Sequence, residues 1–295
     1  MSLDTYLVVC AGKSRSREAK QIIRVMEAEF LSGKGRRGGL ARFYPDVFAS
    51  PMGRLYGLVD AHGDVVATLG ARLFKIRRDD ERLTAAMIGF VLARPDRRGR
   101  GLGQRLMAET AAHLAASGVD LGVLWTARFD LYLRSGWQVV DPSLVGPWRG
   151  GATTPASATW IKAPFAPALR RRLNRLRPQQ ALERPSIIYD KLPYPAERVW
   201  AATVPGAYVL VGDRGDAAQA LEWAGDTARV VALLGEAARR WPDLLVRGAG
   251  TDSTARHLKR SGLVDLQPEP AGMWISLARR FRRRDGIWIP RLDRI

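Results

Sequence analysis

Cysteine, lysine and long apolar runs are scarce in this chain. Cys10 is the only cysteine among 295 residues, so an internal disulfide is excluded, and no cysteine and histidine cluster has zinc-ligand spacing. No segment approaches the roughly 20 uninterrupted apolar residues of a membrane-spanning helix. The run Leu7–Cys10 is too short for the apolar core of a signal peptide. We therefore expect a cytoplasmic protein with no membrane span and no metal site.

Acidic residues are also few compared with basic ones. The chain has 29 acidic residues against 47 basic ones, which gives a net charge of +18 and an isoelectric point near 11.0. This balance suits a phosphorylated or acidic partner such as nucleic acid, anionic lipid or a polyphosphorylated cofactor. However, the basic residues are nearly all arginines scattered along the chain, and no zinc finger, RNA-recognition signature or basic zipper is present. The sequence permits nucleic acid as a partner without favouring it.

The length of the chain predicts two domains, because 295 residues exceed the usual size of one. The composition changes between residues 150 and 200, where prolines recur and Leu169–Arg177 forms a basic amphipathic run. We read that run as a helix lying on the protein's own surface rather than on a membrane. The predicted organisation is a first domain at 1–165, a basic connector at 166–200, and a second domain with a basic tail at 201–295.

The first third predicts an α/β arrangement with a mixed sheet. Ser16 can cap a helix, and apolar runs and alternation predict further elements. We expect strands at Arg54–Val59, Val65–Ile76, Leu83–Ala93 and Val119–Thr126, with a helix from Leu102 to near Gly118. The strand Leu83–Ala93, the helix from Leu102 and the strand Val119–Thr126 form a βαβ unit. Its loop lies at the carboxyl end of the first of these strands.

The final third repeats this plan with fewer chemical groups. We expect strands at Tyr208–Val211 and Leu244–Val246 and helices at Asp226–Arg240 and Thr251–Arg260. Its segment Leu-Lys-Arg-Ser-Gly-Leu, starting at Leu258, echoes Tyr-Leu-Arg-Ser-Gly-Trp, starting at Tyr132. No glycine-rich loop precedes its first helix, and leucine replaces the tyrosine. The second copy is therefore expected to be degenerate.

The glycine-rich loop predicts an anion site. Gly99, Gly101 and Gly103 fall between a strand and a helix, where backbone N–H groups and the helix N-terminus favour negative charge. A phosphate loop of the Walker type is excluded because no Gly-Lys-Ser/Thr follows. A dinucleotide fingerprint is disfavoured because Asp120, the acidic residue at about the right distance, precedes its strand instead of following it.

The residues around the loop give it a family resemblance. Phe90–Met107 resembles the acyl-CoA motif of the GNAT acetyltransferase superfamily, in which Arg/Gln-x-x-Gly-x-Gly/Ala joins a strand to a helix. A second hallmark follows as Tyr132-x-x-x-Gly136-Trp137, and the resemblance covers about residues 60 to 140. The tandem arrangement looks like that of Eis-type acetyltransferases and mycothiol synthase. It implies a tandem GNAT fold with an active N-terminal copy and a degenerate C-terminal copy.

The resemblance also implies roles in an N-acetyltransferase that uses acetyl-CoA as co-substrate. Tyr132 would be the general acid, the backbone N–H of Val91 would bind the acetyl oxygen, and Ala93 would pair with the pantetheine arm. The backbone of the loop would bind the pyrophosphate through Arg98, Gly99, Arg100, Gly101, Leu102 and Gly103. The Arg98 and Arg100 side chains would add charge-assisted contacts.

The acceptor and the general base stay open at this stage. Met87 stands where the histone-acetylating branch carries a glutamate base, and the candidates left are Glu27, Glu29, Asp130 or a water chain. We expect the acceptor to be a primary amine of a small molecule or peptide. The alternatives are acetylation of a protein or tRNA, or a non-catalytic acyl-CoA sensor or interaction protein.

Overall fold

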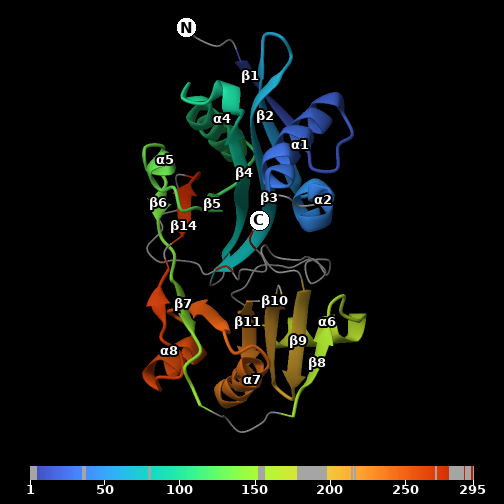
Figure 1. The fold of residues 1–295 in the computed structure, drawn as a ribbon. Coiled ribbons are helices and arrows are strands. Elements are labelled where there is room, and N and C mark those ends of the chain that lie inside the picture. The colour runs from blue at the N-terminus through green and yellow to red at the C-terminus, as the bar shows by residue number, and fades with distance from the viewer. Residues whose placement is uncertain are drawn as a thin grey trace. The chain divides into compact units, whose positions relative to one another are not determined.

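The computed structural model in Figure 1 divides into two compact units. It describes residues 5–34, 38–78, 81–151, 157–177, 198–213, 215, 217–269, 271–278, 289 and 294. The first unit holds the chain up to Val140 and a segment that starts at Gly272, and the second unit holds Asp141–Ala271. Within the described residues, no helix has both the length and the apolar character needed to cross a membrane.

The first unit is built on a seven-stranded mixed sheet. Its strands run in the order β1-β2-β3-β4-β5-β14-β6. Their bounds are β1 (Thr5–Ala11), β2 (Gly53–Asp60), β3 (Val65–Arg78), β4 (Glu81–Ala93), β5 (Leu121–Trp125), β6 (Gln138–Val139) and β14 (Gly272–Ser276). Only β4 and β5 pair in parallel, and the other neighbours are antiparallel. The predicted α/β fold with a mixed sheet is confirmed.

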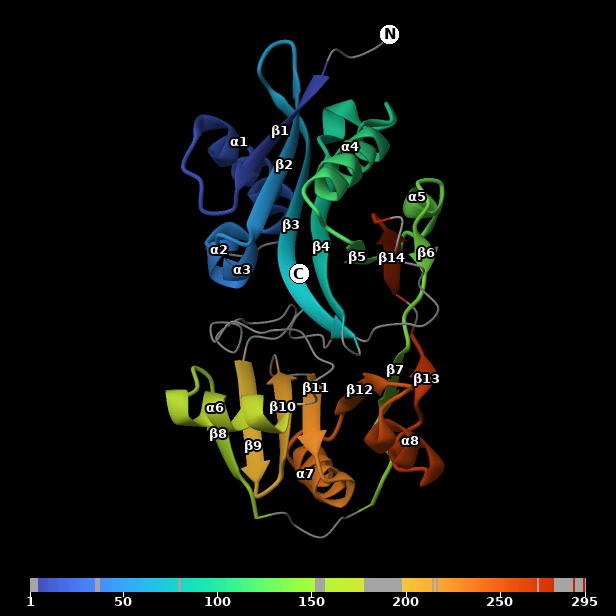
Figure 2. The same ribbon diagram turned by 180° about the vertical axis from the view of Figure 1, so that it is seen from behind.

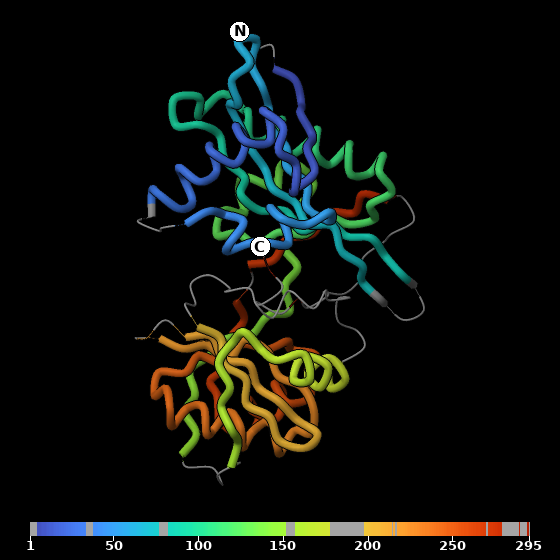
Figure 3. The backbone as a smooth tube through the Cα atoms, turned by 90° about the vertical axis from the view of Figure 1, so that its right-hand side faces the viewer, coloured from blue at the N-terminus to red at the C-terminus, as the bar shows by residue number. Residues whose placement is uncertain are grey.

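Helices cover both faces of this sheet. They are α1 (Arg17–Phe30), α2 (Leu40–Phe43), α3 (Pro45–Phe48), α4 (Leu102–Ala116) and α5 (Asp130–Leu133). The Ser16 hydroxyl caps α1 as expected, accepting a hydrogen bond from the Ala19 N–H at 3.1 Å. Because side chains alternate along strands, α1 and α4 pack on opposite faces of the sheet (Figures 1 and 3).

The second unit repeats this design. Its sheet has the strand order β13-β7-β12-β11-β10-β9-β8. The strand bounds are β7 (Ser143–Pro147), β8 (Thr159–Lys162), β9 (Arg198–Val204), β10 (Ala207–Asp213), β11 (Ala218–Gly225), β12 (Leu245–Ala249) and β13 (Gln267–Pro268). The helices are α6 (Pro167–Leu176), α7 (Thr227–Arg240) and α8 (Ser253–Arg260). As in the first unit, β11 and β12 are parallel neighbours.

The basic helix α6 packs on the second sheet. Leu173 is fully buried against Tyr208 and Leu210 of β10, whereas Arg171 and Arg175 are exposed. The helix therefore lies on the protein's own surface, with the charges of Arg171 and Arg175 in solvent. Residues 178–197 of the expected connector, and nearly all of the expected basic tail, fall outside the described residues.

The two sheets exchange one strand each. In the first sheet β14, from near the end of the chain, lies between β5 and β6, as Figure 2 shows from behind. In the second sheet β7 lies between β12 and β13. The domain boundary expected at residue 165 places β7 and β8 in the first domain and β14 in the second. The structure assigns them the other way, because pairing between distant segments outweighs chain order.

Candidate active site

Strands β4 and β5 separate at their carboxyl ends. Their parallel pairing covers Ala85–Met87 on β4 and Leu121–Val123 on β5. Beyond these residues β4 continues to Ala93 without pairing to β5, while β5 stays paired with β14 up to Trp125. The separation leaves part of β4 available for hydrogen bonding to something other than β5. It lies at the carboxyl end of a central strand, where open α/β sheets bind ligands.

A β-bulge in β4 shapes this region. Thr68 pairs with Leu92 and Gly70 with Gly89, so Phe90 and Val91 together oppose one residue of β3. Phe90 has a φ of +56°, an uncommon value for a bulky residue. A Cβ at Gly70 would lie 3.0 Å from the Phe90 ring, so glycine there makes room for the bulge.

The bulge sends neighbouring side chains to opposite faces. The Phe90 ring points to the α1 side, where Phe30, Tyr44 and Phe48 surround it edge-on at centroid distances of 5.4, 4.8 and 5.1 Å. Val91 and Ala93 are half-buried and pack on the α4 side. Phe90 is thus fixed by aromatic packing, which holds the backbone of Val91 in place.

The glycine-rich loop leads directly into α4. Gly99 and Gly101 have φ values of +77° and +72°, a left-handed conformation that favours glycine. Gly101 is the N-cap residue and supplies no side-chain cap, and the first turn of α4 has no acidic residue. The N–H groups of the first turn have no partner inside the helix. A Cβ at Gly99, Gly101 or Gly103 would meet nothing within 4 Å, so the space in front of the helix is open.

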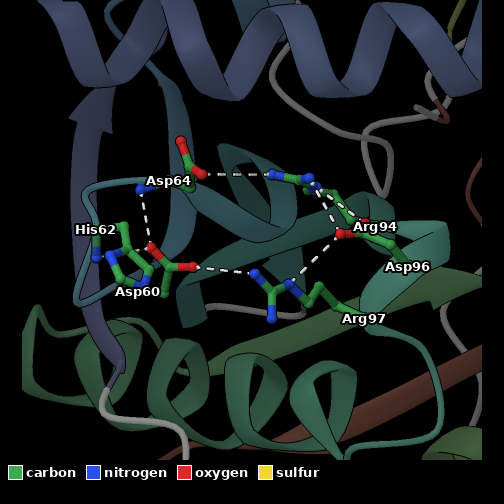
Figure 4. A network of polar contacts seen from close by, with 6 residues as sticks. All are labelled: Asp60, His62, Asp64, Arg94, Asp96 and Arg97. Carbon is green, nitrogen blue, oxygen red and sulfur yellow. Dashed lines mark hydrogen bonds and ion pairs between the residues drawn. The ribbon is translucent and has the colours of Figure 1, made fainter.

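A polar network fixes the residues just before this loop. Asp60, at the end of β2, accepts the backbone N–H groups of His62 and Asp64 at 3.0 Å and forms an ion pair with Arg97 at 3.6 Å. Arg97 and Arg94 both pair with Asp96 (Figure 4). The β2–β3 turn and the start of the loop are thereby tied together.

Two further arginines of the loop, Arg98 and Arg100, lie outside this network. Arg98 donates to the Ala93 carbonyl at 3.2 Å and pairs with Glu29 of α1 at 3.2 Å, and both ends of that pair are largely exposed. Arg100 is exposed. An exposed pair such as Arg98 and Glu29 contributes about 0–1 kcal/mol, so an anion can compete for the arginine.

Tyr132 lies on α5, close to the end of β5. It is half-buried, packs against the same apolar cluster as Val91 and Ala93, and contacts the Trp137 ring edge-on at 6.3 Å. Burial raises the pKa of the Tyr132 phenol above its ordinary value of 10. The hydroxyl is therefore protonated at neutral pH, as a proton donor must be.

Each carboxylate considered as a base has a partner. Glu27 accepts the Leu40 N–H at 2.9 Å, and Glu29 pairs with Arg98. Asp130 pairs with Arg128 at 3.2 Å, and the hydrogen bond from Arg128 lowers the pKa of that carboxyl. A lowered pKa makes Asp130 a weaker base. The choice among these candidates stays open.

A buried ion pair beside this site could not be foreseen from sequence patterns. Met87 is fully buried and pairs across the sheet with Arg72, so the two side chains share a face. Arg72 forms an ion pair with Asp46 of α3 at 3.0 Å, with exposed fractions of 2% and 4%. A carboxylate thus reaches the α1 face of the sheet near Met87, although the strand itself offers none there. Asp46 follows Pro45 in a short helix, and its arginine partner lies on another element.

Comparison with known proteins identifies the fold. Residues 13–140 match the family described as acetyltransferase (GNAT) domain. A probable N-acyltransferase of unknown function from Enterococcus faecalis V583 aligns with a TM-score of 0.70 and 16% identity, over 92% of this chain and 73% of that one. No curated protein matches the chain.

Two further solved structures share the tandem design. Eis1 from Mycobacterium abscessus aligns with a TM-score of 0.64 and 12% identity over 92% of this chain and 74% of its own. A tandem GNAT protein from the clavulanic acid biosynthesis pathway aligns with a TM-score of 0.54 and 12% identity over 93% and 99% of the two chains. The class defined by this fold and domain is the acyltransferases. Within that class, residues 13–140 match the GNAT acetyltransferase domain, and the whole chain has the fold of these tandem GNAT structures.

Proposed function

We propose that the protein is an N-acetyltransferase that moves an acetyl group from acetyl-CoA to a primary amine of a small molecule or peptide. The observation that carries the proposal is the continuity of the first unit's site. The separated end of β4, with its bulge at Val91, leads through the loop to the open N-terminus of α4. Tyr132 packs on the same apolar cluster as Val91.

The residues present fit coenzyme A. The space in front of Gly99, Gly101 and Gly103 is open, and Gly101 leaves the helix end uncapped. Backbone N–H groups from Arg98 to Gly103 would hold the pyrophosphate, with Arg98 and Arg100 adding charge. The backbone of Ala93 would pair with the pantetheine arm as an added strand does. When bound, acetyl-CoA supplies an acyl group activated as a thioester.

The chemistry left to the protein is modest. The N–H of Val91 would donate a hydrogen bond to the acetyl oxygen as negative charge develops there, an effect worth a few kcal/mol. Tyr132 would donate its proton to the departing sulfur, because a phenol that stays protonated can neutralise a nascent thiolate. The acceptor amine must lose a proton, and the base that takes it is one of the candidates above or a water chain.

The direct test is an assay of free thiol released from acetyl-CoA across a panel of amines, peptides, proteins and tRNA. We expect release that depends on a small amine or peptide and is lost when Gly103 is replaced by valine. Release of thiol only in the presence of protein or tRNA would mean that the acceptor is a macromolecule and not a small amine or peptide. Binding of CoA without release for any acceptor would favour a sensor.

A further inference from the structure

Three tryptophans gather on the α7 face of the second sheet. Trp160 of β8 and Trp200 of β9 lie on neighbouring strands, and Trp241 follows the last residue of α7. The Trp241 ring contacts the Trp160 ring edge-on at a centroid distance of 5.1 Å, and it is tilted by 55° to the Trp200 ring at 6.3 Å. Each of the three residues is half-buried. The cluster therefore presents aromatic surface at the β8 end of the sheet.

Two carboxylates hold the polar edges of these rings. The indole N–H of Trp160 donates a hydrogen bond to Glu236 of α7 at 2.9 Å. The indole N–H of Trp200 donates one to Asp213 of β10 at 2.5 Å. This N–H is the only polar group of a tryptophan side chain. Because it is already bonded in both residues, the two rings can offer a ligand only their apolar surface.

The guanidinium of Arg240, the last residue of α7, lies over all three rings. Its central carbon is 4.3 Å from the centre of the Trp200 ring, 5.0 Å from that of Trp241 and 5.9 Å from that of Trp160. Glu236 lies four residues before Arg240, the usual spacing of an ion pair on a helix, but it bonds to Trp160 instead. Arg240 is exposed, and within the described part of the chain its guanidinium has no hydrogen bond or ion pair. Its N–H groups are therefore available to an anion.

A second cation lies on the same face. Lys162 pairs with Trp200 across β8 and β9, so their side chains project from the same side of the sheet. Lys162 is exposed, and among the residues that the structure describes its ammonium group has no partner. Together these side chains form a tryptophan platform, which consists of Trp160, Lys162, Trp200, Arg240 and Trp241. The platform combines aromatic surface with two cations that no acidic side chain neutralises.

This composition fits a polymer that carries planar rings and negative charges in alternation. We propose that the tryptophan platform binds single-stranded nucleic acid, with bases stacked on the rings and with Arg240 and Lys162 paired with phosphates. Stacking of bases on aromatic side chains tolerates any sequence, and the net charge of +18 adds an attraction that salt weakens. A guanidinium stacks on aromatic rings and also binds phosphate through its N–H groups, so Arg240 can do both at once. The inference goes beyond acetyl transfer and does not depend on it.

The test is fluorescence anisotropy of a labelled oligouridine of about 12 nucleotides, titrated with the full chain. Trp200→Leu should lower the affinity about tenfold, because it removes the ring nearest to Arg240. Oligothymidine of the same length should behave in the same way, since stacking does not read the sugar. A duplex should bind more weakly, because its bases already stack on one another. Equal binding of the duplex would overturn the proposal.

Trp148→Leu is the matched control for the aromatic variant. Trp148 is also half-buried and has its indole N–H bonded, to the Gly150 carbonyl, but it follows β7 near the opposite end of the sheet. This variant should keep its affinity for oligouridine within about twofold of wild type. Heparin, a polyanion without bases, should bind wild type and Trp200→Leu alike. Equal losses in the two tryptophan variants, or an equal loss of heparin and oligouridine binding in Trp200→Leu, would overturn the proposal.

Arg240→Gln tests the phosphate contact at an exposed position, so it stays informative if Trp200→Leu proves unstable in thermal unfolding. It should lower the affinity about fivefold and reduce the salt dependence by about one phosphate contact. Arg260→Gln is its matched control, because Arg260 is the exposed last residue of α8 as Arg240 is of α7. It should leave the salt dependence unchanged. Equal effects of the two arginine variants would mean that net charge alone attracts nucleic acid, and the platform would be excluded.

Discussion

The two units place a helix after a central strand in opposite ways. In the first, a loop with two left-handed glycines separates β4 from α4, and no side chain caps the helix. In the second, α7 follows β11 directly, and the Asp226 carboxylate accepts the Arg229 N–H at 3.0 Å. A carboxylate at a helix N-terminus satisfies the same groups that would bind a phosphate, and its charge repels one. Of these two helices, α4 is the one whose N-terminus is open to an anion.

The segments that follow α5 in the first unit and α8 in the second can be compared in the same way. The backbone N–H of Trp137 donates a hydrogen bond to the Tyr132 carbonyl at 3.4 Å. The backbone N–H of Leu263 donates one to the Leu258 carbonyl at 3.1 Å. The backbone turn is therefore shared. Tyr132 is half-buried with a hydroxyl, whereas Leu258 is fully buried in the core of the second unit. The second unit therefore has the same backbone turn, but it has no hydroxyl at this position that could donate a proton.

The central strand of the second unit, β11, carries a buried carboxylate. Its pairing with β10 shifts register as β4 does, but Glu222 there is 2% exposed, accepts a hydrogen bond from Tyr208 and pairs with Arg177 at 3.7 Å. Helix α6 covers this face. The two units therefore differ at the N-terminus of the helix that follows the central strand and at the position of Tyr132, where the second unit has Leu258.

The largest expected effect comes from removing β14. A fragment ending at residue 165 lacks the strand between β5 and β6 and should show no cooperative thermal unfolding. The Val140 N–H bonds to the Gly272 carbonyl at 3.0 Å, so an Asn-Gly turn can join these residues as a hairpin. The fragment 5–140 joined in this way to 272–278 should fold and bind CoA. Failure of the joined form to fold would show that the first unit depends on residues of the second unit.

Replacement of Gly103 by valine should come next in size. A Cβ there meets no protein atom within 4 Å, so the fold should be unaffected, but it intrudes where the backbone must approach the pyrophosphate. We expect CoA affinity to fall by at least about 100-fold, or about 2.7 kcal/mol, with an unchanged melting temperature. Gly103 is a cleaner position than Gly101, whose left-handed φ would also strain any replacement.

Ala228→Val is the matched control, because Ala228 is the second residue of α7 as Gly103 is of α4. Normal CoA binding by Gly103→Val would make the loop structural only, and weakened binding by Ala228→Val would give the second unit a share in the cofactor site.

Tyr132→Phe should lower the turnover number by about 100-fold or more while leaving acetyl-CoA affinity nearly unchanged, because only the hydroxyl is removed. Since burial raises the pKa of Tyr132 above 10, its acid form is present below that pH and is lost only as the pH rises beyond it. Any change of the wild-type turnover number between pH 7 and 9 therefore comes from a group other than Tyr132. The same pH dependence should remain in the variant. Single-turnover rates close to wild type would exclude Tyr132 from the mechanism.

The smallest expected effect is that of Asp226→Ala. Loss of the cap should destabilise the protein by about 1 kcal/mol, measured by urea unfolding of the second unit. Affinity for CoA should not change, either upward or downward. A second CoA site appearing in this variant would show that the cap alone had closed α7, which would sharpen the comparison between the units.

Local patterns predicted the starts of individual helices better than they predicted the order of strands in the sheet. Ser16 before an apolar stripe gave α1, and the glycines before Leu102 gave the start of α4, since caps and breakers act over a few residues. The position of β14 could not be predicted, because Gly272–Ser276 pairs with β5 residues that are about half the chain away. The ion pair of Asp46 with Arg72 was missed for the same reason.

The central claim is that one unit binds the cofactor and the other cannot. Titration calorimetry of the full chain with CoA tests it most directly. The account predicts one site per chain, abolished by Gly103→Val and unchanged by Ala228→Val. Two equivalent sites, or one site that persists in Gly103→Val, would contradict it.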